Sequence, residues 1–531
     1  MRLQLALAPS LLVQLAAGAA EAKTVNVTDV STLTAAIAAA AAGDEIVLAA
    51  GTYHFTSSPT CSAAGTPASP VVVRAATPLT AKIEFDTLEG FRVTGPSWRF
   101  EGLDVHGVCG DDTNCEHAFH VTGKATGFVL RSNRIVDFNA QLKVNADTSG
   151  PGGAIAQPNG GLVEGNEVFD THSRQTSNPV TKLNIDAVDD WVVRANVLYD
   201  GHKNGGDGVS YQSFNKGGGK NGVYERNLVI CTKNETSGGT RIGLSFGGGG
   251  TGAQFCAPAF NAGTPCDVEQ TNGTMRNNII VNCSDVGIYL NKSKDTKLLY
   301  NTLIGTNGID FRFGTTSGEA DGNVLSSVLR IRDGATMTKK ANLENVLEAT
   351  FTAMYMAPLA GDLRKKGDLS ALLGKVAARA DVTDDYCARA RSGSYDLGAL
   401  QASLGDCTTT TPPAGTGGPD GGSGPGGSDA GVDSGASGSG GNGGDASTTT
   451  PSSDAPGEAG DSSGCACTAA PERGGAGSLA VLIGLAFAYG LRRARARRPS
   501  VERRTYDAIL AGLPSDQMVV VWGEDDNTFK P

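Results

Sequence analysis

The chain has 531 residues, of which 73 are glycine and only 6% are aromatic, so it is long and rich in turns. Its formal net charge of −11 argues against a nucleic-acid partner, because binding phosphates requires a basic surface. Its 11 cysteines are more than a reducing cytosol usually tolerates without a metal-binding or catalytic role, which favours export.

The N-terminal segment has the features of a secretory signal peptide. Residues 1–22, MRLQLALAPSLLVQLAAGAAEA, combine one arginine, an apolar run and a small-x-small end at Ala20 and Ala22. We therefore predict cleavage near Lys23 and an exported mature protein.

The next segment predicts a cap for a solenoid. Residues 31–55, STLTAAIAAAAAGDEIVLAAGTYHF, indicate a short helix from Ser31 to about Ala42, a turn and a strand. Together with SPVVVRAAT (69–77) and FRVTGPSWRFEGLDVHG (91–107), this opening resembles the start of the polysaccharide lyase family that contains chondroitinase B and the alginate lyases. The resemblance extends over about residues 25–145 and is architectural beyond them.

A short phrase with one asparagine between two apolar stretches recurs seven times. Alternate residues are apolar before each asparagine, as in Val192 and Arg194, so the repeating unit is a strand. The asparagines are 22 to 51 residues apart, which marks a repeat architecture. Coils stacked about 4.8 Å apart would let each buried amide bond the amides above and below. The predicted ladder is Asn133, Asn166, Asn196, Asn227, Asn278, Asn301 and Asn323.

These patterns predict an all-β fold. We expect a single-stranded right-handed parallel β-helix of the pectin-lyase type over residues 23–406, with the helix near residue 31 as its N-terminal cap.

Four strands that begin with glycine define a candidate face of this solenoid. Alternation sends every second side chain into the core. The inward set is Val209, Tyr211, Leu244, Phe246, Ile288, Leu290, Ile309 and Phe311. The outward set is Ser210, Gln212, Ser245, Tyr289, Asn291, Asp310 and Arg312, with Asp186 and His120 extending the row. Such groups suit a sugar-binding surface, and a solvated polar face would have the same pattern.

The resemblance to the lyases implies a mechanism. Calcium would neutralise a uronic acid carboxylate, a lysine would remove the neighbouring proton and an arginine would assist. Family members carry two glutamates two residues apart and a lysine five residues after the second. Set against NGGDGVSYQS (204–213), these positions hold Gly205, Asp207 and Gln212, so only Asp207 matches.

The resemblance assigns the roles of metal ligand, base and assisting arginine to residues near this strand. The resemblance assigns Asp186 and Asp207 as calcium ligands and Arg241 as the assisting arginine. Lys203 and Lys216 flank the strand, and Lys216 is the candidate base.

Six cysteines are candidates for disulfide bonds. Cys109 and Cys115 are close in sequence, and so are Cys256 and Cys266. The second pair lies in SFGGGGTGAQFCAPAFNAGTPCDVE (245–269), the insertion that lengthens one repeat and has the character of a functional loop. The third candidate pair, Cys231 and Cys283, follows two ladder asparagines and would lie in adjacent coils.

The C-terminal part has three segments. Residues 407–464 contain almost no large apolar side chain and predict a disordered Gly/Ser/Thr/Pro-rich stalk. Residues 465–498 combine cysteines, an apolar run long enough to cross a bilayer and an arginine cluster. They resemble the C-terminal sorting signals of myxobacterial surface proteins, which implies processing near Cys465 or Cys467 and retention at the cell surface. Because residues 499–531 follow as a further tail, a plain transmembrane anchor is the alternative.

The sequence therefore predicts a monomeric, surface-anchored protein that binds an acidic polysaccharide, with cleavage by β-elimination as its leading activity. A non-catalytic glycan-binding protein or adhesin would use the same face. A pectin-type glycoside hydrolase is a second alternative, since NID (184–186), VDD (188–190) and DGHK (200–203) are similar to the aspartate and histidine motifs of polygalacturonases.

Overall fold

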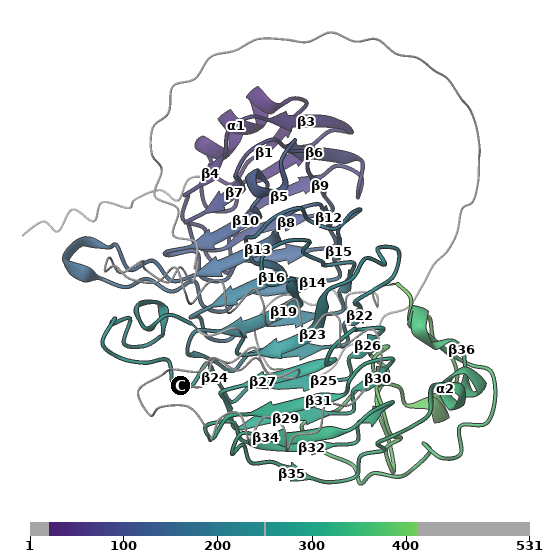
Figure 1. Cartoon of the computed structure of the whole chain (residues 1–531). Coiled ribbons are helices and arrows are strands. Elements are labelled where there is room, and N and C mark those ends of the chain that lie inside the picture. The colour runs from purple at the N-terminus through teal and green to yellow at the C-terminus, as the bar shows by residue number, and fades with distance from the viewer. Residues whose placement is uncertain (1–20, 249–250, 412–531) are drawn as a thin grey trace, which may run out of the picture. The chain divides into compact units, whose positions relative to one another are not determined.

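The computed structural model describes residues 21–248 and 251–411 (Figure 1). The predicted stalk, anchor and tail lie outside these residues, as does nearly all of the predicted signal peptide. The chain divides into two units, Met1–Cys465 and Ala466–Pro531, and all of the described residues belong to the first. None of the helices in the described ranges has both the length and the apolar character needed to span a membrane.

The described chain winds into stacked coils that form three long parallel sheets (Figure 1). Sheet A contains β1 (Thr24–Val27), β2 (Glu45–Leu48), β5 (Val71–Ala75), β8 (Trp98–Glu101), β11 (Val129–Arg131), β14 (Leu162–Glu164), β17 (Val192–Arg194), β21 (Val223–Glu225), β25 (Thr274–Arg276), β29 (Thr296–Leu299), β32 (Gly318–Asp321) and β35 (Thr338–Lys339). Sheet B contains β3 (Gly51–Phe55), β6 (Ala81–Phe85), β9 (Asp104–Gly107), β12 (Arg134–Val136), β15 (Glu167–Phe169), β18 (Val197–Tyr199), β22 (Leu228–Ile230), β26 (Ile279–Val281), β30 (Thr302–Ile304) and β33 (Val324–Leu325). Sheet C contains β4 (Thr60–Cys61), β7 (Glu89–Val93), β10 (His117–Thr122), β13 (Ala140–Asn145), β16 (Val180–Asp186), β19 (Val209–Lys216), β23 (Thr240–Phe246), β27 (Ile288–Asn291), β31 (Ile309–Arg312) and β34 (Leu329–Arg332).

Each sheet pairs strands in sequence order, one coil to the next, which is the right-handed parallel β-helix that the sequence predicts. A small fourth sheet of β20 (Gly219–Lys220), β24 (Gln270–Thr271) and β28 (Ser293–Lys294) continues the turns that leave sheet C. Apolar side chains from all three long sheets fill one continuous core.

Helix α1 (Val30–Ala38) covers the N-terminal end of this core. Asp29 caps it, because the Asp29 carboxylate accepts a hydrogen bond from the Thr32 N–H at 2.9 Å. Leu33 and Ile37 are the buried residues of the helix. The predicted cap is therefore confirmed, although the helix ends at Ala38, before the predicted end near Ala42.

The asparagine ladder is confirmed in the turn between sheets A and B. Each predicted ladder amide donates a hydrogen bond to the side-chain oxygen of the next asparagine, over 2.8–3.0 Å. The last of these bonds runs from Asn323 to Asn342, a rung that the sequence repeat does not reveal. The ladder satisfies buried polar groups at a bend that would otherwise lack partners.

The three predicted disulfides are present as Cys109–Cys115, Cys231–Cys283 and Cys256–Cys266. A fourth joins Cys387 to Cys407. Four disulfides in one chain fit an extracellular protein.

Residues 343–409 do not add coils to the solenoid. They include α2 (Glu348–Met354) and an antiparallel pair, β36 (Tyr355–Ala357) and β37 (Asp362–Lys365). Phe351, Leu363 and Tyr386 of this segment form a second core with outward side chains of sheet B. The segment thus covers the C-terminal strands of sheet B, as Figure 1 shows for α2 and β36 beside β26 and β30.

Arg379 holds this covering segment to sheet A. Its guanidinium lies 2.5 Å from Glu319, 2.9 Å from Asp321 and 2.9 Å from Asp381. The hydrogen bond from Arg379 is the main cause of the lowered pKa of Asp381. Burial alone would raise the pKa of Glu319, but Arg379 and Lys340 lower it.

Arg379→Met is expected to destabilise the protein by about 3 kcal/mol, because three carboxylates lose a largely buried partner. Both carboxyl pKa values are lowered on folding, so the stabilisation is complete above their ordinary values of 3.8 and 4.5 and is lost as the pH falls below them. Urea unfolding at neutral and acid pH measures both effects. Arg364→Met, which removes an exposed partner of Asp362, is the matched control and is expected to leave the unfolding midpoint nearly unchanged.

Candidate functional site

The outer face of sheet C carries a continuous line of side chains, which we call the outer row. Leu142, Leu183, Leu244 and Ile288 point into the core with no exposed surface, so the residues that follow them point outward. Strand register places these outward residues above one another in consecutive coils. The outer row is Arg92, His120, Lys143, Asn184, Phe214, Ser245, Tyr289, Asp310 and Arg330.

Beside the middle of the outer row lies a cluster of Lys143, Asp186 and Lys216, which we call the lysine–aspartate cluster. Lys143 forms a short ion pair with Oδ2 of Asp186 and donates a hydrogen bond to Asn184 at 3.0 Å. Lys216, directly opposite Asp186 in the next coil, approaches its Oδ1 at 3.7 Å. The Lys216 ammonium also lies 4.7 Å from the centre of the Phe214 ring.

The charges of this cluster determine the ionisation of its aspartate. Burial by itself raises the pKa of Asp186, but Lys143 and Lys216 outweigh burial and lower it. Asp186 therefore stays ionised and holds two cationic groups from neighbouring coils at one point of the face. Two such groups suit an anionic ligand, one to neutralise its carboxylate and one to exchange a proton.

Long loops accompany this part of the face. Figure 1 shows residues 146–161 (blue) and 251–269 (teal) extending past the ends of the sheet C strands. Glu269 fixes the second loop, since its carboxylate accepts hydrogen bonds from Thr251 N at 2.9 Å and Gly217 N at 2.9 Å. The loop is thereby tied to the residue that follows Lys216.

The structure does not bring Arg241 to the lysine–aspartate cluster. Arg241 is opposite Ser210 of β19, whereas Asp186 is opposite Lys216 of the same strand. Ser210 and Lys216 are six residues apart, so Arg241 and Asp186 are separated by roughly 20 Å along the strand direction. The Arg241 guanidinium is buried and donates hydrogen bonds to the carbonyls of Glu235 at 2.5 Å and Ser237 at 2.6 Å. It organises the turn before β23.

The two predicted calcium ligands are also separated. Asp207 lies before the first residue of β19 and pairs with Lys203 at 2.5 Å, whereas Asp186 is level with the last residue of that strand. Calcium binds six to eight oxygen atoms, but both Asp186 oxygens face lysine ammonium groups. The residues around Asp186 therefore do not fit a calcium ion.

The predicted alternation fails at the start of β19. Ser210 and Gln212 were expected to point outward, yet both are fully buried, whereas Val209 and Tyr211 are only half-buried. The reason is the turn over residues 200–208. Its Lys203 N–H donates to the Ser210 hydroxyl at 2.9 Å, and its Gly201 carbonyl accepts from Gln212 at 3.2 Å.

The other predicted binding residues lie on the outer face but have partners of their own. The Ser245 hydroxyl is buried and donates to the Tyr289 carbonyl at 2.8 Å, and Asn291 lies 3.5 Å from the Tyr289 hydroxyl. Asp310 accepts from Arg330 at 2.5 Å and Arg332 at 3.0 Å. Arg312 contacts Asp333 at 2.7 Å and the Tyr289 hydroxyl at 3.3 Å.

His120 lies in the outer row beside Lys143, as predicted. Its Nδ1 atom is 2.7 Å from Glu89 Oε1, and its Nε2 atom is 2.7 Å from Asn145 Oδ1. Burial by itself raises the pKa of Glu89, but His117 and His120 hold it well below the usual range.

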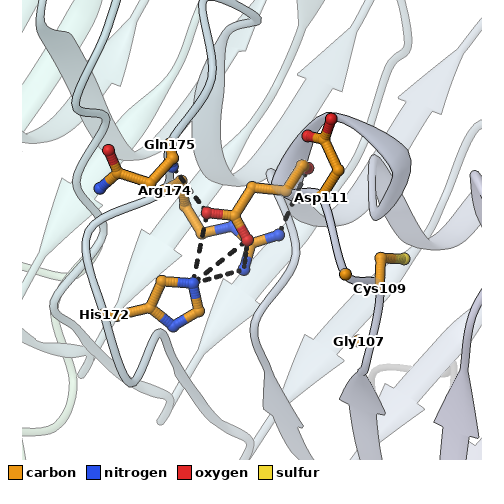
Figure 2. Close-up of a pocket in the computed structure, with 8 residues that line it drawn as sticks. Gly107, Cys109, Asp111, His172, Arg174 and Gln175 are labelled. Atoms are coloured by element: carbon orange, nitrogen blue, oxygen red, sulfur yellow. Dashed lines mark hydrogen bonds and ion pairs between the residues drawn. The ribbon is translucent and has the colours of Figure 1, made fainter. Parts of the chain in front are cut away.

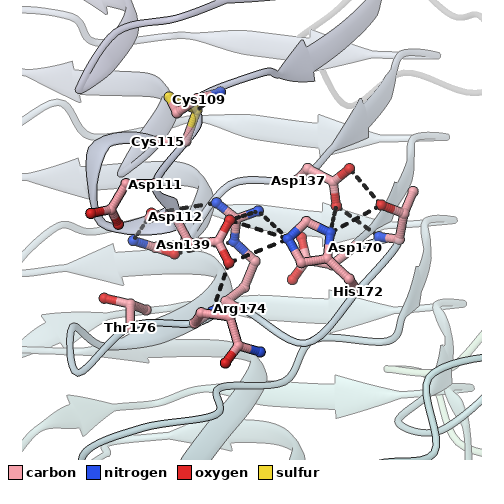
Figure 3. A network of polar contacts seen from close by, with 12 residues as sticks. Cys109, Asp111, Asp112, Cys115, Asp137, Asn139, Asp170, His172, Arg174 and Thr176 are labelled. Carbon is pink, nitrogen blue, oxygen red and sulfur yellow. Dashed lines mark hydrogen bonds and ion pairs between the residues drawn. A yellow bond between two sulfur atoms is a disulfide. The ribbon is translucent and has the colours of Figure 1, made fainter.

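A cavity of about 450 Å³ lies among the turns between sheets B and C (Figure 2). Asp112, His172 and Arg174 come together there: Asp112 is 3.1 Å from His172 Nε2 and 2.9 Å from Arg174 Nη1. The network continues to Asp137, which is 3.7 Å from His172 Nδ1, and to Asn139, which accepts from Arg174 at 3.3 Å (Figure 3).

This network joins the turns of three successive coils beside the Cys109–Cys115 disulfide. Arg174 is buried, and Asp112 also accepts a hydrogen bond from the Gln175 N–H at 2.6 Å. Since its side chains have one another as partners, we interpret the network as a brace for these turns. Its residues are not among those that the sequence singles out.

Sequence reasoning missed Lys143, which completes the lysine–aspartate cluster. The signal was present: AQLKVN (140–145) alternates in the same way as the strands that defined the face, and Lys143 takes the outward position between Leu142 and Val144. Its apolar neighbours are both fully buried.

No protein-family model and no curated protein matches this chain. Solved structures with similarity to the chain are found. The pectate lyase Pel9A is 16% identical with a TM-score of 0.48, over 72% of this chain and 97% of that one. A rhamnogalacturonan lyase is 14% identical with a TM-score of 0.41, over 66% and 96%. An alginate lyase from Paenibacillus is 15% identical with a TM-score of 0.34, over 60% and 99%. The order of strands in the three long sheets makes the chain a right-handed parallel β-helix, and the solved structures that it is similar to are named as polysaccharide lyases.

Proposed function

We propose that the outer face of sheet C binds a uronate-containing polysaccharide and cleaves it by β-elimination at the lysine–aspartate cluster. The observation that carries this proposal is the meeting of Lys143 and Lys216, from coils on either side, at the single buried carboxylate of Asp186. A proton beside a carboxylate is weakly acidic until positive charge stabilises the developing dianion. Two lysines at one point supply both that charge and a base.

Each residue of the cluster has a distinct role in the proposal. Lys143 neutralises the substrate carboxylate. Lys216, once its ammonium proton has passed to solvent, takes the proton from the carbon beside that carboxylate. The electron pair of the broken C–H bond then forms a carbon–carbon double bond as the glycosidic C–O bond breaks. The leaving oxygen takes a proton from water. Asp186 is a positioning residue, because it holds both lysines without contacting the reacting atoms.

The rest of the outer row suits an extended anionic chain. Arg92 places positive charge toward one end of the row, and the half-buried ring of Tyr289 offers a surface for a sugar ring. Residues 343–409 pack against the C-terminal strands of sheet B and not against the outer row of sheet C.

The polymer is identified by incubating the full chain with alginate, pectate, chondroitin and dermatan, each with calcium and with a chelator. Products with an unsaturated uronate end support the lyase. Binding without cleavage favours the glycan-binding protein or adhesin, and new reducing ends without unsaturation favour the hydrolase. The hydrolase would need a carboxylate pair other than Asp186 and Asp207, since glycosidase carboxyl groups lie within about 10 Å of each other.

We also propose that the mature protein is held at the cell surface through residues 465–498. Export is supported by the four disulfides. The anchoring segment itself lies outside the described residues.

A further inference from the structure

A second cluster lies on the outer face of sheet C, formed by Glu89 of β7 and by His117 and His120 of the adjacent strand β10. Glu89 Oε1 is 2.7 Å from His120 Nδ1 and 3.5 Å from His117 Nδ1. All three candidate ligand atoms lie within 4.8 Å of one another. Three ligands on one tetrahedral metal, each at about 2.0–2.1 Å, lie about 3.3 Å apart, so these side chains are close to a metal-binding arrangement.

A neutral His120 ring cannot donate both of the hydrogen bonds that its surroundings require. Its Nε2 faces Asn145 Oδ1, which only accepts, and its Nδ1 faces the Glu89 carboxylate, which also only accepts. The orientation of the Asn145 amide is fixed, because its Nδ2 donates to the Ala146 carbonyl at 2.9 Å. A neutral imidazole carries one N–H, so one of the two contacts requires an additional cation, either a proton or a metal ion.

His117 supplies an independent observation. Its Nδ1 atom is buried and makes no hydrogen bond. The Glu89 Oε1 atom lies 3.5 Å from it. A buried ring nitrogen without a partner costs free energy unless something binds it. A metal ion between the three side chains would satisfy His117 and His120 together, whereas a proton on His120 would leave His117 unchanged.

We propose that Glu89, His117 and His120 bind a divalent transition metal, with zinc as the first candidate. Two imidazoles and one carboxylate are a common zinc ligand set, and calcium prefers oxygen ligands. Asn145 would orient His120 by accepting its Nε2–H, as outer-shell partners of metal-bound histidines do. Three protein ligands leave a fourth coordination position open. The site is one coil away from Lys143, which lies opposite His120 in the neighbouring strand.

The test uses the full chain without an affinity tag, stripped of metal by a chelator and titrated with zinc in a calorimeter. We expect one equivalent to bind. His117→Ala and Glu89→Gln are each expected to weaken binding at least about tenfold, and Asn145→Ala about tenfold. His54→Ala, which changes an exposed histidine 3.4 Å from Glu84 on sheet B, is the matched control and should bind zinc as the unchanged chain does.

Cobalt(II) provides a readout that needs no variant. The unchanged chain is expected to develop the visible absorption of a four-coordinate cobalt ion, and excess zinc should abolish it. The proposal is overturned if the unchanged chain takes up neither metal. It is also overturned if His117→Ala, with an unaltered circular dichroism spectrum, binds zinc as tightly as the His54→Ala control. Neither readout depends on polysaccharide cleavage.

Discussion

Lys216→Ala is expected to reduce kcat for uronate chain cleavage by about 10²- to 10⁴-fold, because it removes the base that takes the proton. Lys143→Ala is expected to reduce kcat/KM by a similar factor, since the carboxylate and the developing dianion then lack their neutralising charge. Both effects follow from the shared contact of the two lysines with Asp186. Initial rates of formation of the unsaturated product measure them.

Two further variants distinguish the catalytic role of the lysines from the general effect of removing a positive charge. Lys294→Ala removes an exposed lysine from β28 and is expected to leave the rate within about twofold of the unchanged chain. Asp186→Asn keeps the shape of the cluster but removes the charge that positions the two lysines. We expect it to change the dependence of kcat on pH and to leave KM nearly unchanged. The account is wrong if Lys216→Ala and Lys294→Ala cleave equally fast.

Asn227→Ala is expected to destabilise the solenoid by about 3 kcal/mol or more, because it breaks the ladder in its middle. The Asn227 amide donates to Asn278 Oδ1 at 3.0 Å and to the Val193 carbonyl at 2.9 Å, and its oxygen accepts from Asn196. Alanine removes these three hydrogen bonds and also the one that the Asn196 N–H donates to the Asn227 oxygen, all at a buried bend. Each buried group left unsatisfied costs about 1–3 kcal/mol. Urea or thermal unfolding measures the change.

Asn204→Ala is the matched control for the ladder. Asn204 lies exposed in a turn, where its amide donates to Gln175 at 2.9 Å. Its replacement is expected to cost less than about 1 kcal/mol, because water replaces the lost partner. Equal losses for the two variants would contradict the structural role of the ladder.

The fold could be predicted because its signals repeat along the chain. Seven asparagines at the same place in each coil, with alternating apolar residues before them, specify a stacked solenoid without any knowledge of its loops. The same periodicity located Cys231 and Cys283 in adjacent coils, where they form a disulfide. Asn342 was missed because its rung follows the last repeat that carries the full phrase.

The site was harder to predict because it depends on the ends of the strands. Alternation placed Asp186 on the face, and Lys216 was a candidate because it flanks the strand aligned with the lyases; register brings the two residues together. The same rule was wrong for Ser210 and Gln212, because the preceding turn folds over them and supplies hydrogen-bond partners that pattern alone does not show. Arg241 was assigned by resemblance, yet its guanidinium is engaged by loop carbonyls.

The length of a strand explains why the predicted calcium pair fails. Asp186 and Asp207 are 21 residues apart in sequence and belong to neighbouring coils, but they lie toward opposite ends of β19. Glu89 and His117, in contrast, occupy directly opposed positions on adjacent strands. Opposed positions in register, rather than closeness in sequence, bring side chains together in this fold.

The most direct test of the proposed function is the ultraviolet absorbance of unsaturated uronate during incubation of the full chain with each acidic polysaccharide, beside the Lys143→Ala/Lys216→Ala double variant. We predict that the absorbance rises with at least one uronate polymer for the unchanged chain and stays at the background level for the double variant. An equal rise with both proteins, or cleavage of the polymer without any rise, would contradict β-elimination at the lysine–aspartate cluster.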